Sequence, residues 1–520
     1  MMAKRKNGAG RPDGDGAHAA RPGDDGGSVR ALVRLSGELS TKSRRTRGRF
    51  QKRLRANLED AFSAEGIAAR VDAGWSRFYV EVPDEASLAP LGRTFGVSSG
   101  SVVVGTCAAE LDAVVDTGRR LFADRVRGHT YAVRARRSGT HGFSSADIHR
   151  ELGAALNEGA TVDLGAPEVT VHVEVRDERA FFYHDRFAGP SGLPLGVQGR
   201  ALVLISGGFD SAVAAWMALR RGVALDYLFC NLGGSAYERM VVEVAKVLAD
   251  SWSYGTRPRL HVLEFGPVVD AMRAAAKPAY LQVVLKRLMY RAASRVGGEI
   301  GAEALVTGES IGQVSSQTLT NLRAIDDASA LPVLRPLLGF HKEEIIARAK
   351  EIGTYDLSAR VREYCSVAPG KPVTAASPRD ARAQEEAVGT AEVERAVAGR
   401  HTLDLRDLDP RAMVGVGLYV TEIPDDAAVI DTRPVEAYAA WHWPGAAHRD
   451  LAGLEASFGE LDKTRTYVLV CAEGIRTAYV AEHMQREGFE AYSFLGGAPR
   501  LRRLSAGTAA GGTGGEDRER

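Results

Sequence analysis

The segment SGGFDS at residues 206–211 has the residue types and spacing of a phosphate-binding loop. It stands between an apolar strand pattern, residues 201–205, and an apolar helix pattern that Gly222 ends. Two adjacent glycines let a backbone approach a polyphosphate, and the first N–H groups of the helix are unpaired donors at the positive end of its dipole. No Gly-Lys-Ser/Thr follows, which excludes a Walker A loop. The segment therefore predicts a nucleotide site, and a plain tight turn is the alternative.

Further polar residues follow the strand patterns of the same region. Thr307, Gly308 and Glu309 come directly after the strand pattern EALV, and ligands of open α/β sheets bind at the carboxyl ends of strands. Lys286 and the segment 315–318 (SSQT) are weaker signals, because a surface lysine or a turn residue is the commoner explanation of each. Together they favour one site at this edge of the sheet.

A cysteine loop near the C-terminus indicates sulfur chemistry. Cys471 begins the segment C-x-x-G-x-R between an apolar strand, residues 466–470, and a helix pattern. Loop N–H groups, a helix N-terminus and Arg476 would all stabilise a thiolate or a persulfide anion there. A phosphatase loop is excluded, because it needs one more residue between Cys and Arg. The alternative is a buried hydrophobe at a strand end.

Cys365, in the segment EYCS, is the second candidate thiol. A lone cysteine is more often structural, but persulfide chemistry needs a second thiol to attack or reduce the persulfide. Cys107 and Cys230 lie in apolar stretches and are most simply buried hydrophobes. The four cysteines lie more than a hundred residues apart with no C-x-x-C pair, which excludes a disulfide scaffold and gives a zinc site no local support. We therefore expect no protein-held metal site.

The length of the chain predicts that these candidate sites lie in several domains. At roughly 150 residues per domain, the 520 residues predict three or four domains. The chain is 45% hydrophobic and 26% charged, with a net charge of +1, which are ordinary values for a folded protein. No apolar run approaches 18 residues and no signal peptide is present, so we expect a cytoplasmic protein that does not enter a membrane.

The N-terminal part is more basic than the rest of the chain. Between Ser28 and Asn157 there are 21 Lys/Arg and 14 Asp/Glu, and the acid-free segment 42–55 holds eight of these positive residues. This segment, helical in its spacing, and the strand and turn at residues 134–143 could follow a phosphate backbone. Few aromatic residues are interleaved, which favours contacts to a duplex backbone over base stacking. A solvated charged face is the alternative.

Taken in order, these parts resemble the tRNA 4-thiouridine synthetases, or tRNA sulfurtransferases, over roughly residues 28–500. The resemblance rests on RRSGTHGFSSADI, VTVHVEV, LISGGFDS, FCNLGG, LKRLMYRAAS, LVTGESIGQVSSQTLTNL and EYCSV, and on rhodanese-like segments that include Asp431, residues 442–446 and residues 495–497. It implies an α/β multidomain protein with a ferredoxin-like α+β domain, a THUMP domain, a PP-loop domain with a parallel sheet, and a rhodanese domain. The boundaries that we expect are a disordered extension at 1–27, a ferredoxin-like domain at 28–85, a THUMP domain at 86–190, a PP-loop adenylation domain at 191–395, a linker at 396–420, a rhodanese domain at 421–505 and a disordered tail at 506–520.

The resemblance also implies a mechanism. A PP-loop enzyme cleaves ATP between the α- and β-phosphates, so ATP, carried with Mg²⁺, would adenylate uridine 8 of tRNA and sulfur would then replace O4. Cys471 would carry the persulfide, Cys365 would form a disulfide with it, and Asp210 would serve adenylation. The ATP contacts that this implies are Leu204, Ile205, Ser206, Gly207, Gly208, Ser211, Lys286, Gly308 and Gln317.

The partners implied are tRNA, a cysteine desulfurase as persulfide donor, and the sulfur-carrier protein of thiazole synthesis, with a possible homodimer. Two alternatives stay open. The chain could be a PP-loop enzyme acting on another RNA position or on a small molecule, although a small molecule would not need a basic platform. It could also be a non-catalytic RNA-binding sulfur carrier, against which the intact SGGFDS segment speaks.

Overall fold

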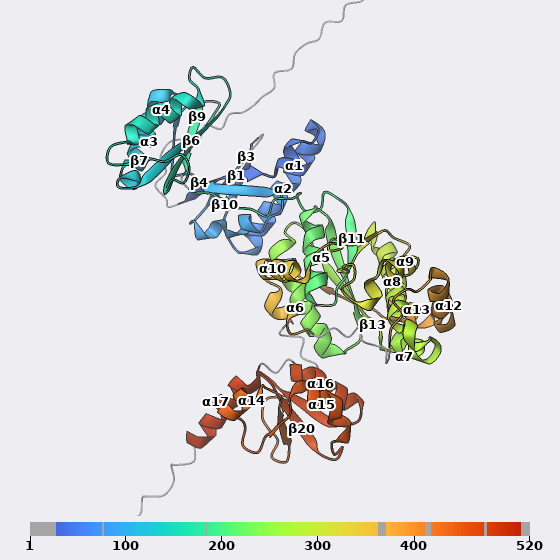
Figure 1. Cartoon of the computed structure of the whole chain (residues 1–520). Coiled ribbons are helices and arrows are strands. Elements are labelled where there is room, and N and C mark those ends of the chain that lie inside the picture. The colour runs from blue at the N-terminus through green and yellow to red at the C-terminus, as the bar shows by residue number, and fades with distance from the viewer. Residues whose placement is uncertain are drawn as a thin grey trace, which may run out of the picture.

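Four β-sheets organise the computed structural model, which describes residues 28–74, 77–183, 185–361, 371–410, 418–472 and 476–510. We call the units built around them the N-terminal, second, third and C-terminal domains. In Figure 1 the N-terminal and second domains (blue and teal) lie at one end of the molecule, and the third domain (green to yellow) lies in the middle. The C-terminal domain (orange to red) lies at the other end. No helix of the described ranges is long and apolar enough to cross a membrane.

The N-terminal domain packs helix α2 (Arg44–Ala64) on an antiparallel sheet. The helical spacing of the sequence is confirmed, since Phe50, Leu54, Leu58 and Phe62 are buried against the sheet. The polar face of α2 carries the exposed basic residues. Arg53 differs from these, because its guanidinium donates to the carbonyls of Leu195 and Gly255. The sheet order is β10-β4-β1-β3-β2, with β1 (Val29–Leu35), β2 (Arg70–Ala73), β3 (Arg77–Val82), β4 (Val97–Val102) and β10 (Phe187–Ala188).

The second domain places two helices, α3 (Leu111–Val126) and α4 (Ser145–Leu156), on a mixed sheet. The predicted start of α4 near Ser145 is confirmed, and a capping box between Ser144 and Asp147 explains it, because each satisfies a backbone N–H of the other. The sheet order is β5-β9-β8-β6-β7, with β5 (Gly105–Ala108), β6 (Thr130–Ser138), β7 (Thr161–Val162), β8 (Val169–Arg176) and β9 (Arg179–Tyr183).

Strand β4 shows where the expected boundary at residues 85/86 was wrong. The range 86–190 expected for the second domain includes this strand, but it pairs with β1 from Ala31↔Val102 to Leu35↔Val97 and so completes the N-terminal sheet. A strand pattern records which side chains are buried and not which sheet buries them, so sequence alone could not assign it.

A buried ion cluster joins the N-terminal and second domains. Glu174 of β8 is 2% exposed and pairs with Arg34 of β1, Arg77 of β3 at 3.3 Å, and Arg176 of its own strand. Burial by itself would raise the pKa of Glu174, but the charges of Arg77 and Arg176 outweigh burial and hold that pKa below its ordinary value. The cluster therefore fixes the two sheets against each other.

Replacing Glu174 by alanine should leave three arginines of this junction without the carboxylate with which they pair. We expect a loss of about 3–5 kcal/mol of stability, as for other broken buried pairs, and a fall in Tm of roughly 10 °C for the transition of these domains, measured by calorimetry. Because its folded pKa is lowered, the Glu174 carboxylate stabilises the protein fully above its unfolded pKa, and that contribution is lost as pH falls through the folded pKa. The control is Glu81→Ala, which removes a more exposed pair with Arg30 and should cost less than about 1 kcal/mol. An equal effect of the two substitutions would contradict the interpretation.

The third domain is built on a mostly parallel sheet of order β15-β14-β11-β12-β13-β16. The chain adds β12 and then β13 on one side of β11, and it then crosses over to add β14 on the other side. The order in which strands are added therefore reverses at β11. Loops that follow β11 and β14 flank a crevice at such a point. The strands are β11 (Arg200–Leu204), β12 (Ala224–Asn231), β13 (Arg259–Glu264), β14 (Ala304–Val306), β15 (Val333–Leu334) and β16 (His401–Asp404).

Helices cover both faces of this sheet, and two separate apolar clusters fill the space on either side of it. Strand β16 lies inside the expected linker 396–420, yet it pairs antiparallel with β13 from Arg259↔Asp404 to Val262↔His401. Its four residues are too few and too polar for a pattern to reveal. The helices are α5 (Phe209–Arg220), α6 (Ser235–Trp252), α7 (Gly266–Ala275), α8 (Leu281–Ile300), α9 (Leu319–Asp326), α10 (Lys342–Ile352), α11 (Tyr355–Ser358), α12 (Pro378–Val388) and α13 (Ala391–Ala398).

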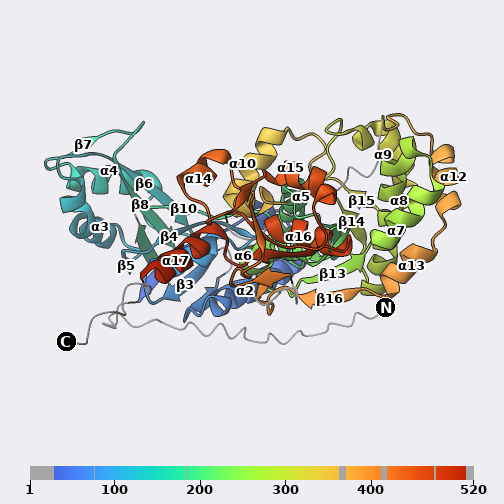
Figure 2. The same ribbon diagram turned by 90° about the horizontal axis from the view of Figure 1, so that it is seen from below.

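The C-terminal domain has a parallel sheet of order β17-β21-β20-β18-β19 with helices around it. In both views it lies against the third domain near α6 (Figures 1 and 2). The expected tail 506–520 begins inside α17, whose backbone stays helical to Ala510, and the rest of that tail and the extension 1–27 lie outside the described residues. The elements are β17 (Tyr419–Val420), β18 (Ala428–Asp431), β19 (Ala447–His448), β20 (Thr466–Val470), β21 (Glu490–Phe494), α14 (Val435–Ala440), α15 (Leu451–Ser457), α16 (Arg476–Arg486) and α17 (Gly497–Ala510).

Candidate active sites

The loop from Ser206 to Ser211 joins β11 to α5, as its strand–loop–helix pattern predicts. Gly207 has φ +77°, a left-handed conformation that favours glycine, and Gly208 is the N-cap of α5. The loop is braced from within, because the Ser206 N–H donates to Oγ of Ser211 at 3.2 Å and that hydroxyl donates to the Gly208 carbonyl at 3.1 Å. A rigid loop at a helix N-terminus is a ready anion site.

Asp210, in the first turn of α5, faces two side chains from distant parts of the chain. The Lys342 ammonium donates to its two carboxylate oxygens at 2.8 and 3.0 Å, and the Gln313 amide donates at 2.8 Å. Lys342 was missed by the sequence reasoning. It is the first residue of α10, where the helix dipole disfavours a positive charge, and that mismatch is the signal that could have identified it.

A cavity of about 500 Å³ opens between the loops that follow β11 and β14. Its lining includes the apolar side chains of Leu228, Cys230, Leu232 and Leu285 together with several polar groups. Such an apolar slot with convergent polar groups fits an aromatic base and its attached phosphates. The predicted residues that line it are Leu204, Ile205, Ser206, Asp210, Ser211, Lys286, Gly308 and Gln317, whereas Gly207 and Gly208 belong to the loop but not to the lining.

Lys286 reaches the cavity from α8 and is held by a buried acid. Its Nζ lies 3.9 Å from the Glu309 carboxylate, which also accepts from Tyr290 at 2.7 Å and from Arg335 at 2.8 Å. Burial would raise the pKa of Glu309, but the charges of Lys286 and Arg335 outweigh it and lower that pKa. Glu309 therefore stays ionised and holds the Lys286 ammonium at the cavity wall.

Gln317 supplies a group that suits a nucleobase. Its Oε1 is buried in the cavity lining and accepts no hydrogen bond from any residue of the described ranges. A buried acceptor without a partner is costly, and an exocyclic amino group such as that of adenine would satisfy it. Its predicted role as an ATP contact is consistent with this placement.

Gly308 follows β14 and packs directly on the loop. A Cβ atom built on it would lie 2.5–2.7 Å from backbone atoms of Asp210 and Ser211, so only glycine allows this approach. The two loops that flank the crevice are therefore in backbone contact, and a change at either displaces the other.

Gly308→Ala should push the loop out of shape. We expect ATP affinity to fall at least about tenfold, since a clash with backbone cannot be relieved by a rotamer change, while affinity for tRNA stays unchanged. Equilibrium binding of labelled ATP and of tRNA measures both. Gly298→Ala in α8 is the matched control, because a Cβ there meets no atom within 4 Å. Normal ATP binding by the Gly308 variant would contradict the role of this contact.

Cys471 lies at the end of β20 in the C-terminal domain and is 7% exposed. The Thr477 hydroxyl donates to its sulfur at 3.4 Å from the first turn of α16, and Thr477 in turn hydrogen-bonds Ser493 at 2.8 Å. A cavity of about 270 Å³ beside the sulfur is lined by Arg360, Arg433 and Arg476 among others. The Arg433 guanidinium is neutralised by Asp431 of β18 at 2.6 Å. The surroundings are those that stabilise a sulfur anion.

The remaining cysteines divide into three cases. Cys365 lies outside the described residues. Cys230 is buried, as predicted, and lines the cavity of the third domain. Cys107 is only partly buried, and burial raises the pKa of its thiol, which disfavours a reactive thiolate. Among the described residues, no three or more His, Cys, Asp or Glu side chains gather as a metal-binding group.

Comparison with known families divides the chain in the same order as its sheets. Residues 30–101 match the ThiI ferredoxin-like domain, residues 108–185 the THUMP domain, residues 196–389 the thiamine biosynthesis protein (ThiI), and residues 419–501 the rhodanese-like domain.

Curated relatives match nearly the whole chain. A tRNA sulfurtransferase of Desulfurococcus amylolyticus is 38% identical over 91% of this chain and 98% of the relative, and one of Pyrobaculum aerophilum is 38% identical over 89% and 96%. Among solved structures, a 4-thiouridine synthetase in complex with RNA and ATP is 30% identical, with a TM-score of 0.63, and covers 72% of this chain and 99% of that one.

Proposed function

The chain belongs to the tRNA sulfurtransferase family, and on that basis we propose that it adenylates a uridine of tRNA and replaces O4 with sulfur carried by Cys471. The α/β multidomain fold predicted from the sequence is confirmed, with ferredoxin-like, THUMP, PP-loop and rhodanese domains in that order. The coarser activity, ATP-dependent sulfur transfer to tRNA, is that of the family. The finer steps below are our proposal.

The cavity of the third domain supports ATP activation of the uridine. Its apolar side chains would hold adenine, with Gln317 as acceptor for the amino group, and the loop N–H groups would face the phosphates. O4 of the uridine attacks the α-phosphorus, the bond to the bridging oxygen breaks, and pyrophosphate leaves with its charge facing Lys286 and Lys342. A Mg²⁺ ion carried by ATP would neutralise further phosphate charge, and Asp210 is a carboxylate of the cavity lining that could hold it.

Cys471 would supply the sulfur. The terminal sulfur of its persulfide attacks C4 of the adenylated uridine and AMP leaves, which links C4 to Cys471 through a disulfide. Thiolate attack by Cys365 on Sγ of Cys471 then breaks that bond, releases thiouridine and leaves a Cys365–Cys471 disulfide. A cellular dithiol returns the two electrons. The arginine-lined cavity at Cys471 is the single observation that best supports this sulfur carrier.

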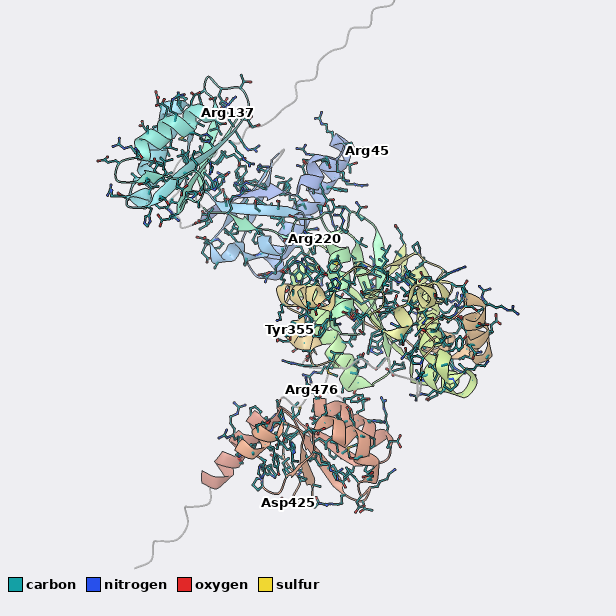
Figure 3. All side chains as sticks on the ribbon, viewed as in Figure 1. Arg45, Arg137, Arg220, Tyr355, Asp425 and Arg476 are labelled. Carbon is teal, nitrogen blue, oxygen red and sulfur yellow. The ribbon has the colours of Figure 1, made fainter. Side chains whose placement is uncertain are left out.

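The N-terminal and second domains would hold the tRNA. Lys42, Arg44, Arg45 and Arg49 are exposed along the start of α2, and Arg134, Arg136 and Arg137 along β6. Figure 3 labels Arg45 and Arg137 on these two domains. Cationic side chains on two rigidly joined sheets suit phosphate contacts along a folded RNA.

Several expectations stay proposals. They are uridine 8 as the target, a cysteine desulfurase as persulfide donor, delivery to the sulfur-carrier protein of thiazole synthesis, a homodimer, a cytoplasmic location, and the remaining domain limits stated above.

Mass spectrometry of tRNA nucleosides tests the proposed reaction. Cells that lack this protein should lose 4-thiouridine and regain it when the intact chain is restored. Loss of a different thiolated nucleoside would favour the alternative of another RNA position. Unchanged thiolation in both would contradict the proposal.

A further inference from the structure

The cavity beside Cys471 lies at the junction of two domains. Most of its lining comes from the C-terminal domain, but Arg360, just after α11, belongs to the third domain. A second cavity of about 160 Å³ shares Arg360 and Arg476 with it and reaches Met240 of α6. Figure 3 labels Arg476 on the face of the C-terminal domain that meets the third domain. The surroundings of Cys471 are therefore completed by a different domain.

A carboxylate holds this junction together. Helix α6 begins after Gly234, which has a φ of +82° and no side chain that could cap the helix. Glu482 of α16 acts as the cap instead, because its carboxylate accepts from the N–H of Ser235 at 3.0 Å and of Ala236 at 3.1 Å. A carboxylate at a helix N-terminus accepts hydrogen bonds from backbone N–H groups that have no partner within the helix, and its negative charge is attracted to the positive end of the helix dipole. The cap crosses from one domain to the other.

Packing around this cap is close. A Cβ atom on Gly234 would lie 2.3 Å from both Oε1 of Glu482 and a guanidinium nitrogen of Arg486, so a larger residue would displace these two side chains, and the φ of +82° itself favours glycine. The Ala236 side chain is 4% exposed and packs into the apolar core of the C-terminal domain. A further contact between the two domains comes from Arg476, which donates to the Ala359 carbonyl at 3.4 Å. The cap, the Ala236 side chain and this hydrogen bond therefore all hold the docked arrangement.

We propose that Arg360 completes the anion site for the Cys471 sulfur, and that the site exists only while the Glu482 cap keeps the C-terminal domain docked on α6. This rests on the proposed role of Cys471 as the sulfur carrier. A persulfide places its terminal sulfur about 2 Å beyond Sγ, in the cavity that the three arginines line. Arg433 pairs with Asp431, and Glu455 lines the adjoining cavity together with Arg360 and Arg476, so three arginines stand against two carboxylates and the surroundings of that anion keep a positive balance.

Docking has a consequence for loading. Cys471 is 7% exposed in the docked arrangement, and Arg360 of the third domain covers part of its cavity, so docking narrows the access of a macromolecular donor to the sulfur. The docked form therefore protects the persulfide, and an undocked form receives it. Arg360 is a positioning residue in this scheme, because it enters and leaves the site with the domain.

Alkylation of Cys471 in the reduced full-length protein tests whether Arg360 supplies positive charge near its sulfur. Iodoacetate and iodoacetamide share a leaving group but differ in charge, so the ratio of their rates reports the positive charge near Sγ. We expect Arg360→Ala to lower the iodoacetate-to-iodoacetamide ratio about three- to tenfold, and Arg360→Lys to keep it near the wild-type value. The peptide that contains Cys471 is quantified by mass spectrometry. An unchanged ratio in Arg360→Ala would overturn the assignment of Arg360.

The rate at which Cys471 reacts with a maleimide attached to a large polyethylene glycol tests whether the Glu482 cap keeps the domain docked. Glu482→Ala should raise its rate with Cys471 at least about tenfold and lower the iodoacetate ratio as Arg360→Ala does, because undocking removes Arg360. Glu487→Ala, which changes an exposed acid just past the same helix, is the control and should do neither. A Glu482 variant as slow as wild type would overturn the docking role. Neither readout needs sulfur transfer to tRNA, so their failure is distinguishable from failure of the sulfur-carrier proposal.

Discussion

Cys471→Ala should lose tRNA thiolation by at least about 100-fold, since no other group at its position can carry sulfane sulfur. The substitution removes one buried sulfur and leaves the cavity of the third domain untouched, so ATP binding, tRNA binding and tRNA-dependent release of pyrophosphate should stay near wild type. Nucleoside mass spectrometry measures the first and a pyrophosphate assay the last. Together they would separate sulfur transfer from activation.

Cys107→Ala is the matched control for this substitution. It also removes one partly shielded thiol, but in the second domain, and should leave thiolation unchanged. Retained thiolation in the Cys471 variant would contradict the sulfur-carrier role and favour direct use of free sulfide. Loss of both pyrophosphate release and thiolation would indicate instead that Cys471 supports the activation step.

Asp210→Asn should have a comparable effect on the other half of the reaction. It keeps the shape of the side chain but removes the charge that holds the Lys342 ammonium at the loop. A displaced cation at a leaving pyrophosphate typically costs about 100-fold in rate, or roughly 2.7 kcal/mol of transition-state stabilisation. We therefore expect pyrophosphate release to fall by about that factor while tRNA binding and alkylation of Cys471 are unchanged.

Glu343→Gln serves as the control for Asp210→Asn. It neutralises an exposed acid next to Lys342, in the same helix turn, and should leave pyrophosphate release within about twofold of wild type. An Asp210 variant with normal pyrophosphate release but no thiouridine would place Asp210 in sulfur transfer and contradict its assignment to adenylation. A variant that thiolates normally would remove it from the reaction.

The features that could be predicted from the sequence are those that depend on residues close together in the chain. The loop at 206–211 and the cysteine at 471 each lie between a strand and a helix, as their patterns predicted, because backbone conformation and helix dipoles are local properties. The apolar positions of α2 likewise followed from helical spacing. Predictions that concerned Cys365 lie outside the described residues.

The features that sequence could not provide depend on contacts between distant residues. Lys342 meets Asp210 across 132 positions, and Glu482 meets Ser235 across 247. Strand β4 falls inside the range expected for the second domain, yet it pairs in the N-terminal sheet. Arg360 shows no local pattern at all, since its surroundings exist only when two domains meet. Tertiary packing, and not propensity, decides these cases.

The buried Glu174 cluster has a consequence for the two domains that we propose to hold tRNA, because it joins their sheets. Two sheets locked by a carboxylate among arginines cannot hinge to follow a flexible partner. The cluster therefore limits how far the cations on α2 can move relative to those on β6. If these cations hold tRNA as we propose, we expect the two domains to discriminate between RNA molecules by backbone shape and not by base sequence.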